Sequence, residues 1–138
     1  MWPRRSLPVF VDTSALYALL DRSDDQHLAA ARAFGGLREP GAVTHNYVVV
    51  ESVALAQARL GLEAVRRLLD DLLPVIVVRW IGADLHRAAA AALLASGTAA
   101  ISFVDRVSFA FMREHAIAQA FAYDSHFTRE GFTAFAGQ

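Results

Sequence analysis

Short valine-rich segments alternate along the chain with longer segments of helical pattern, beginning with "VFVD" at residues 9–12. Further strands are expected at "AVTHN" (42–46), at "VIVVRWI" (75–81) and at the end of "AIAQAFAYD" (116–124), which the turn "SHFTREGF" follows. The helices expected between them cover residues 14–21, 25–34, 47–60, 62–73, 83–96 and 102–115, and Asp24 is the expected N-cap of the second. Strands that alternate with helices form a parallel sheet with helices on both faces. The sequence therefore predicts an α/β protein, a three-layer α/β/α sandwich around a short, mainly parallel, twisted sheet of four or five strands.

The composition favours a single domain over residues 1–138, since 55% of the residues are hydrophobic and only 20% are charged. The chain has no cysteine, which excludes disulfides, thiolate catalysis and zinc–thiolate sites. Its 13 basic residues are all arginine, and the net charge of −1 gives no bulk attraction to nucleic acid. No apolar stretch reaches the roughly 18 residues that cross a membrane, so we expect a cytoplasmic protein with no membrane partner.

Four acidic residues stand out because apolar side chains surround them in the sequence. Asp12 and Asp124 follow the apolar runs "VFV" and "AFAY", at the expected ends of strands. Glu51 and Asp105 lie within "YVVVESVAL" and "ISFVDRVSFAFM", where helical spacing places them on apolar faces. Converging carboxylates repel one another, and a divalent cation between them removes that repulsion. Oxygen-only ligands select Mg²⁺ or Mn²⁺, which can activate water for phosphodiester cleavage.

Each of these acids also has a local structural interpretation. Asp12 fits a helix start that the macrodipole stabilises, and Asp105 fits a capping box with Ser102. Asp124 fits a turn before "SHF", and Glu51 fits a buried carboxylate bonded to Thr44 or Asn46. One metal site explains all four positions, whereas the structural interpretations require four independent coincidences.

The segments around these acids resemble the motifs of the PIN domain family, and more closely those of its VapC-type toxin ribonucleases. The resemblance is carried by "VFVDTSALYALLD" with the downstream "DQH", by "THNYVVVES", by "ISFVDRVSFAFMREHAI" and by "AFAYDSHFTREGF". It runs from about residue 9 to residue 135, and the last two motifs are the most specific. Family members often carry threonine two residues before the last aspartate, a position that Ala122 occupies here.

The resemblance implies a PIN-like fold and a magnesium-dependent (or manganese-dependent) endoribonuclease, the toxin of a type II toxin–antitoxin pair. It implies that the catalytic and metal-binding residues are Asp12, Glu51, Asp105 and Asp124. Thr13 and Ser14 are expected to support Asp12 through hydrogen bonds, and Ser102 to support Asp105. The implied partners are an RNA substrate, a cognate VapB-like antitoxin and a second copy of the chain in a homodimer.

Several basic side chains have both a functional and a structural interpretation. His126 in "DSHF" either contacts phosphate and assists the last acid or orders a turn, and His45 offers the same choice before the helix that carries Glu51. Arg66-Arg67 and Arg4-Arg5 are candidate phosphate contacts whose alternative is solvated surface. Arg106, next to one of the acids, is a candidate contact to substrate phosphate at the rim of the site.

Other functions with a parallel sheet fit the sequence less well. Receiver domains and haloacid-dehalogenase phosphatases need a second acid near Asp12 and a lysine, and the chain has no lysine. A nucleotide-binding fold needs a glycine-rich loop after the first strand, where "DTSAL" has none. DNA-cleaving nucleases need further elements to grip a duplex. The alternative that remains is a non-catalytic PIN-like module that binds RNA or a protein.

The mean hydropathy of +0.32 is high for a soluble monomer. Such a composition indicates either an unusually rich core or apolar surface that meets a partner. We expect residues 14–34 and 47–73 to include a groove for a partner helix or a second copy of the chain.

Overall fold

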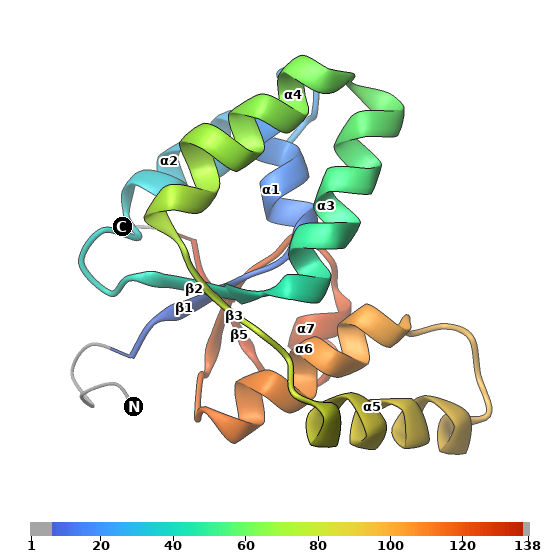
Figure 1. Cartoon of the computed structure of the whole chain (residues 1–138). Helices are drawn as coiled ribbons and strands as arrows, with labels where there is room; N and C mark the ends of the chain where they lie inside the picture. Colours follow the sequence, from blue (N-terminus) through green and yellow to red (C-terminus); the bar gives the residue numbers. More distant parts are fainter. Residues whose placement is uncertain (1–6, 137–138) are drawn as a thin grey trace.

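A parallel sheet of five strands forms the centre of the computed structural model, which describes residues 7–136 (Figure 1). In chain order the strands are β1 (Val9–Val11), β2 (Ala42–His45), β3 (Val77–Arg79), β4 (Gln119–Phe121) and β5 (Thr133–Ala134). Their order across the sheet is β3-β2-β1-β4-β5. Phe10 of β1 pairs with Val43 of β2 and with Ala120 of β4, which makes β1 the central strand.

Helices cover both faces of this sheet (Figure 1). One layer holds α1 (Thr13–Leu20), α2 (His27–Gly35), α3 (Asn46–Arg59) and α4 (Leu62–Arg67), and the other holds α5 (Ala83–Ser96), α6 (Phe103–Glu114) and α7 (His126–Arg129). The predicted α/β/α architecture is therefore confirmed. No helix in residues 7–136 combines the length and the apolar character that a membrane span requires.

The core lies on both sides of β1, because both faces of this strand are covered. All three residues of β1 are fully buried. Leu16 of α1 and Val48 of α3 are buried from one helical layer, and Met112 of α6 is buried from the other. The Phe10 ring also lies 5.9 Å from the Phe111 ring, measured between centroids. Burial on both faces explains why this strand is a continuous apolar run.

The third strand is shorter than the predicted 75–81, since it spans only Val77–Arg79. Pro74 lies in a 3₁₀ turn, Leu73–Val75, which follows α4 and a π-helical turn at Leu68–Leu72. β3 is an edge strand, and the side chain of Trp80 just beyond it is 80% exposed. The valine-rich segment that predicted a longer strand therefore lies at the edge of the sheet, where no further strand from the described part of the chain pairs with it.

Asp24 does not cap the second helix, contrary to the prediction that this helix starts at residue 25. The helix begins at His27, and its N-cap residue, Gln26, makes no side-chain capping bond. The Asp24 carboxylate instead accepts a hydrogen bond from the backbone N–H of Gln26, at 2.8 Å, in the preceding turn. The acid therefore stabilises the approach to the helix rather than its first turn.

The chain reverses direction across the sheet at β1. It passes from β1 outward to β2 and β3, and later returns to the opposite side of β1 to form β4 and β5. Open parallel sheets bind ligands at the carboxyl ends of their strands, next to such a reversal. Asp12 follows β1 directly, and Asp124 lies in the segment after β4, so both acids are at this edge.

Candidate metal centre

One open pocket of about 790 Å³ lies at the carboxyl edge of the sheet and is lined by all four of the predicted acids. Other lining residues include Thr13, Ser14, Ser102 and His126. The acids come from separate elements: the start of α1, the middle of α3, the first turn of α6 and the segment between β4 and α7. The fold therefore brings together carboxylates that are spread from residue 12 to residue 124.

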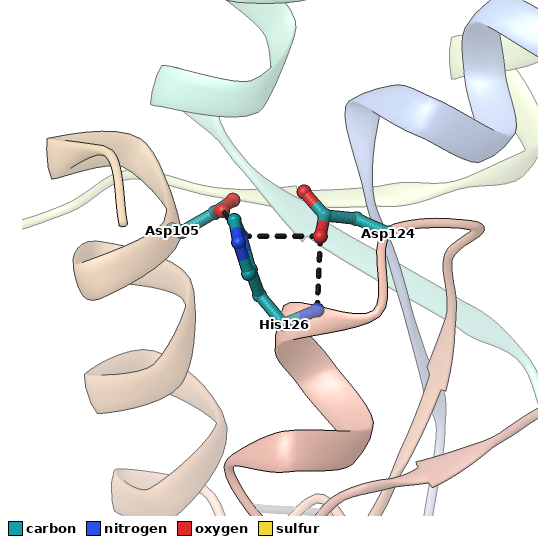
Figure 2. Close-up of side chains that lie close together, drawn as sticks. All are labelled: Asp105, Asp124 and His126. Carbon is teal, nitrogen blue, oxygen red and sulfur yellow. Dashed lines mark hydrogen bonds and ion pairs between the residues drawn. The ribbon is translucent and has the colours of Figure 1, made fainter. Parts of the chain in front are cut away.

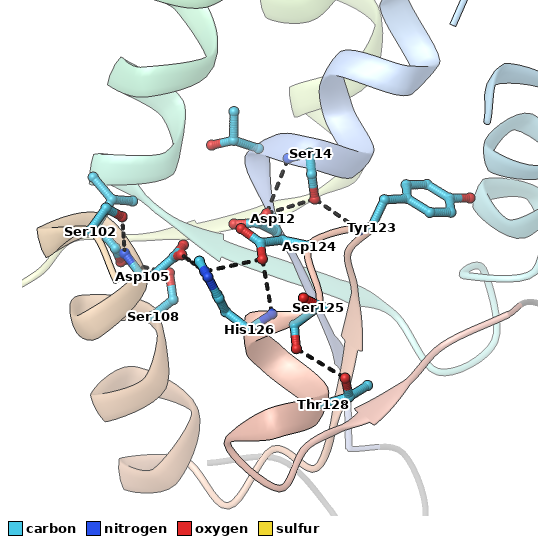
Figure 3. A network of polar contacts seen from close by, with 12 residues as sticks. Asp12, Ser14, Ser102, Asp105, Ser108, Tyr123, Asp124, Ser125, His126 and Thr128 are labelled. Carbon is cyan, nitrogen blue, oxygen red and sulfur yellow. Dashed lines mark hydrogen bonds and ion pairs between the residues drawn. The ribbon is translucent and has the colours of Figure 1, made fainter. Parts of the chain in front are cut away.

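The two carboxylate oxygens of Asp12 differ in their hydrogen bonding. Its Oδ2 accepts hydrogen bonds from the backbone N–H of Ser14 at 3.1 Å and from the Ser14 hydroxyl at 2.7 Å (Figure 3). Its Oδ1 is buried and has no hydrogen-bond partner among residues 7–136. The residue is only 3% exposed, and burial raises the pKa of Asp12 to about 7. A buried carboxylate oxygen without a partner is costly, and a cation in the pocket removes that cost.

Thr13 supports Glu51, and not Asp12 as the sequence predicted. The Thr13 hydroxyl donates to Glu51 Oε1 at 2.5 Å, and the Ser52 hydroxyl donates to Thr13 Oγ1 at 3.3 Å. Burial raises the pKa of Glu51, the Thr13 hydrogen bond opposes this shift, and the charge of Asp105 adds to it. A bond between α1 and α3 therefore fixes the second acid of the pocket.

His126 lies between Asp105 and Asp124 and contacts both carboxylates (Figure 2). Its Nδ1 lies 3.1 Å from Asp105 Oδ2 and 3.1 Å from Asp124 Oδ1. The backbone N–H of His126 also donates to Asp124 Oδ1, at 2.9 Å. Burial raises the pKa of Asp105, and the hydrogen bond from His126 opposes that shift. One ligand atom from each of the three residues lies within 4.8 Å of the other two.

Two serines shape the backbone around these acids (Figure 3). The Ser102 hydroxyl accepts a hydrogen bond from the backbone N–H of Asp105 at 3.0 Å, which caps α6. Ser102 thus acts on the backbone of Asp105, whereas its carboxylate is held by His126. The Ser14 hydroxyl accepts from the backbone N–H of Tyr123 at 2.9 Å, which ties the segment before Asp124 to α1.

His45 has a structural role in the core. It is fully buried, and its Nε2 lies 2.9 Å from the Ser108 hydroxyl. Its Nδ1 accepts from the backbone N–H of Val48 at 3.3 Å, so the imidazole caps α3. Burial lowers the pKa of His45 to about 3, which keeps the ring neutral at physiological pH.

Of the arginines singled out in the sequence, those within residues 7–136, namely Arg66, Arg67 and Arg106, do not line the pocket. Arg66 forms an exposed ion pair with Glu63 at 3.6 Å, and Arg67 donates to the backbone carbonyl of Leu20 at 3.0 Å. The Nε of Arg106 is buried without a hydrogen-bond partner among residues 7–136. Arg4 and Arg5 lie outside the described residues.

Arg59 is a pocket residue that the sequence interpretation missed. It is the one arginine among the described residues that line the pocket, and its guanidinium lies 5.8 Å from the centroid of the Tyr17 ring. Glu51, Leu55 and Arg59 recur every four residues along α3, so they share one face of the helix. That spacing was readable in the sequence, and it places a cation two helical turns beyond an acid of the pocket.

The residues present fit a hard divalent cation. Four carboxylates offer oxygen ligands, which Mg²⁺ and Mn²⁺ prefer. Asp12 Oδ1, which has no hydrogen-bond partner among residues 7–136, is one oxygen that can bind such a cation. The fold and this pocket together define an α/β protein with an acidic, cation-compatible centre at the switch point of a parallel sheet.

Comparison with known proteins identifies the family. A family model for the PIN domain matches residues 9–132, and the chain belongs to the PIN domain family. The 23S rRNA-specific endonuclease VapC20 of Mycobacterium tuberculosis is 36% identical over 125 residues, which cover 90% of this chain and 95% of that protein. The predicted family is therefore confirmed.

Solved structures agree with the family assignment. The crystal structure of M. tuberculosis VapC20, described as a sarcin–ricin loop cleaving toxin, matches with a TM-score of 0.83 at 34% identity. That match covers 91% of this chain and 96% of the VapC20 chain. The crystal structure of FitAcB from Neisseria gonorrhoeae matches with a TM-score of 0.67 at 14% identity, over 92% of this chain and 96% of that one. The second match supports the fold alone.

Proposed function

We propose that this chain is a magnesium- or manganese-dependent endoribonuclease and the toxin of a type II toxin–antitoxin pair, acting in the cytoplasm. The observation that carries this proposal is the pocket at the carboxyl edge of the sheet, where four carboxylates meet and Asp12 Oδ1 lacks a hydrogen-bond partner in the described part of the chain. The name of the relative VapC20, a 23S rRNA-specific endonuclease, supports RNA as the substrate and makes ribosomal RNA the first target to test.

The four acids have distinct roles in this proposal. Asp12 and Asp105 hold the principal cation, since both are buried and lie at rigid helix starts. When bound, the cation supplies positive charge to the reacting phosphodiester and lowers the pKa of a water molecule. Glu51, held by Thr13, orients the attacking water, and Asp124 completes the acidic wall of the pocket.

Removal of divalent cations tests the reaction directly. With Mg²⁺, the wild-type protein is expected to cut a mixed RNA pool into products with 5′-phosphate and 3′-hydroxyl ends, and a chelator is expected to abolish the cutting until cation is restored. The variant Asp12→Asn, purified in the same way, controls for contaminating ribonuclease and is expected to cut little, whereas Asp84→Asn, which changes an exposed acid outside the pocket, is expected to match the wild type. RNA binding without cleavage under both conditions would contradict the proposal and favour a non-catalytic binding module.

Arg59 is proposed to contact substrate phosphate at the end of the pocket away from the carboxyl cluster. A guanidinium suits phosphate because it donates several hydrogen bonds in a planar fork. Arg59→Ala is expected to raise KM for RNA about tenfold or more, since a hydrogen bond to a charged group contributes about 1.5–3 kcal/mol, and to leave kcat nearly unchanged. Arg66→Ala, on the neighbouring helix and paired with Glu63, is the matched control. Equal KM values for the two variants would remove Arg59 from the substrate contact.

We further propose a homodimer and a VapB-like antitoxin as protein partners. Large apolar side chains stay exposed within the two predicted partner segments: Leu28, Val50, Leu62 and Leu69. Leu28 is the most exposed of the four, at 77%. Light scattering of the purified chain is expected to give twice its 15.0 kDa mass. A strictly monomeric chain at high concentration would contradict the homodimer.

A further inference from the structure

In each pocket carboxylate one oxygen accepts a hydrogen bond, whereas the other has no hydrogen-bond partner within residues 7–136. On one side of the pocket, Ser14 donates two hydrogen bonds to Asp12 Oδ2, while Asp12 Oδ1 has no partner among residues 7–136. The Thr13 hydroxyl donates to Oε1 of Glu51. These hydrogen-bond donors thus fix the direction of each carboxylate and leave its second oxygen free to bind a cation.

His126 fixes the direction of the two remaining carboxylates, those of Asp105 and Asp124. Its backbone N–H and its Nδ1 both lie within hydrogen-bond distance of Asp124 Oδ1, at 2.9 and 3.1 Å. The same Nδ1 lies 3.1 Å from Asp105 Oδ2. One imidazole nitrogen therefore bridges carboxylates from two elements, α6 and the segment before α7 (Figure 2).

The nature of these partners indicates what the nitrogen does. An ionised carboxylate only accepts hydrogen bonds, so a ring nitrogen between two carboxylate oxygens carries the proton. A protonated nitrogen has no lone pair to offer to a cation. The His126 nitrogen is close enough to both acids to join a three-ligand site, but beside two ionised carboxylates the same distances suit a donor.

We propose that His126 is a positioning residue, whose Nδ1–H and backbone N–H orient Asp105 and Asp124 so that Asp105 Oδ1 and Asp124 Oδ2 receive the cation. It is not itself a ligand. The inference rests on the proposed function, because the cation that these carboxylates receive serves the proposed nuclease reaction. The hydrogen bonds of His126 can nevertheless be measured without any RNA cleavage. Two carboxylates on separate elements repel each other when no cation is present, and a shared donor holds them at a fixed separation.

The protonation of the ring nitrogen tests the donor role directly. Nitrogen-15 spectra of the histidines in the cation-free wild-type protein at neutral pH report which ring nitrogen carries hydrogen. We expect Nδ1 of His126 to be protonated. A bare Nδ1 with the proton on Nε2 would overturn the inference, because that tautomer cannot donate to either carboxylate.

Cation affinity tests the consequence of the arrangement. Mn²⁺ titration by calorimetry is expected to show affinity about tenfold or more weaker for His126→Ala, as for other residues that orient metal ligands. His126→Asn places an N–H on the atom bonded to Cγ, where Nδ1 lies, and is expected to bind Mn²⁺ nearly as the wild type does. His126→Gln places its amide one bond further out and is expected to resemble His126→Ala.

Matched controls separate positioning from general stability. His86→Asn changes an exposed histidine that contacts Tyr47 outside the pocket, and it is expected to leave Mn²⁺ affinity unchanged. Thermal unfolding of each cation-free variant reports any loss of fold. Equal Mn²⁺ affinity in His126→Ala and the wild type would overturn the inference, as would a loss of affinity in the Asn variant equal to that in the Ala variant.

The outcomes also separate this inference from the proposed function. A wild-type protein that binds Mn²⁺ and shows a protonated Nδ1 but never cuts RNA would remove the nuclease proposal and keep the positioning role. A protein that cuts RNA while Nδ1 of His126 carries no proton would keep the nuclease proposal and remove the positioning role.

Discussion

Asp12→Asn is expected to lower cation-dependent RNA cleavage by roughly 10²–10³-fold or more, the effect of losing a group that stabilises transition-state charge. Asparagine keeps the size of the side chain and an oxygen that can accept from Ser14, but it loses the charge that attracts the cation. Initial rates on 23S rRNA, compared with those of Asp84→Asn, measure the effect. Cleavage by Asp12→Asn at the wild-type rate would show that this carboxylate has no part in the reaction.

The same variant is expected to be more stable than the wild type when no cation is present. Burial raises the pKa of Asp12 from its ordinary value of 3.8 to about 7, so the folded state keeps the proton at pH values where the unfolded state releases it. Stability therefore falls as pH rises from about 4 to about 7, by as much as roughly 4 kcal/mol at 1.36 kcal/mol per pKa unit. Thermal unfolding should favour Asp12→Asn clearly at pH 8 and hardly at pH 4. An equal difference at both pH values would contradict this explanation.

Asp105→Asn is expected to cause a second large loss of cleavage, again roughly 10²–10³-fold. Asp105 as a whole residue is 8% exposed and lies on the first turn of α6, where Ser102 fixes the backbone. Asparagine can still accept the hydrogen bond from His126, so the fold and the histidine contact are expected to survive. Mn²⁺ affinity and cleavage rate should fall together, because the lost charge serves the cation.

Asp124→Asn is the informative comparison for that prediction. Its side chain is 33% exposed, three times the 11% of the Asp105 side chain, so water can replace part of its contribution. A smaller loss than in Asp105→Asn is expected. If Asp105→Asn keeps full activity while Asp124→Asn loses it, the assignment of Asp105 to the principal cation is wrong.

The sequence predicted the strands at the centre of the sheet well, because burial on both faces leaves a distinct pattern. The run "VFV" became β1, and the acids that interrupt such apolar runs lie together in one pocket. The turn assigned to "SHFTREGF" was incomplete, since His126–Arg129 forms the helical turn α7. The two-residue strand β5 was not predicted, because its exposed residues show no apolar pattern.

Side-chain partners were harder to predict than positions, because they depend on elements that are distant in the sequence. Thr13 was assigned to its neighbour Asp12, yet its hydroxyl reaches Glu51, 38 positions along the chain. His126 bridges to Asp105 across 21 positions, and nothing local distinguishes it from a histidine that orders a turn. Sequence spacing thus indicates which face of a helix a residue occupies, but not which side chain from another element forms a hydrogen bond with it.

The position of a bound cation tests the proposed centre most directly. Crystals grown with Mn²⁺ can be measured by anomalous scattering, which locates the metal independently of the protein atoms. We expect a peak within about 2.0–2.6 Å of Asp12 Oδ1 and of a carboxylate oxygen of Asp105, the range for hard cations with oxygen ligands. Manganese bound elsewhere on the protein, with none between Asp12 and Asp105, would contradict the proposed centre.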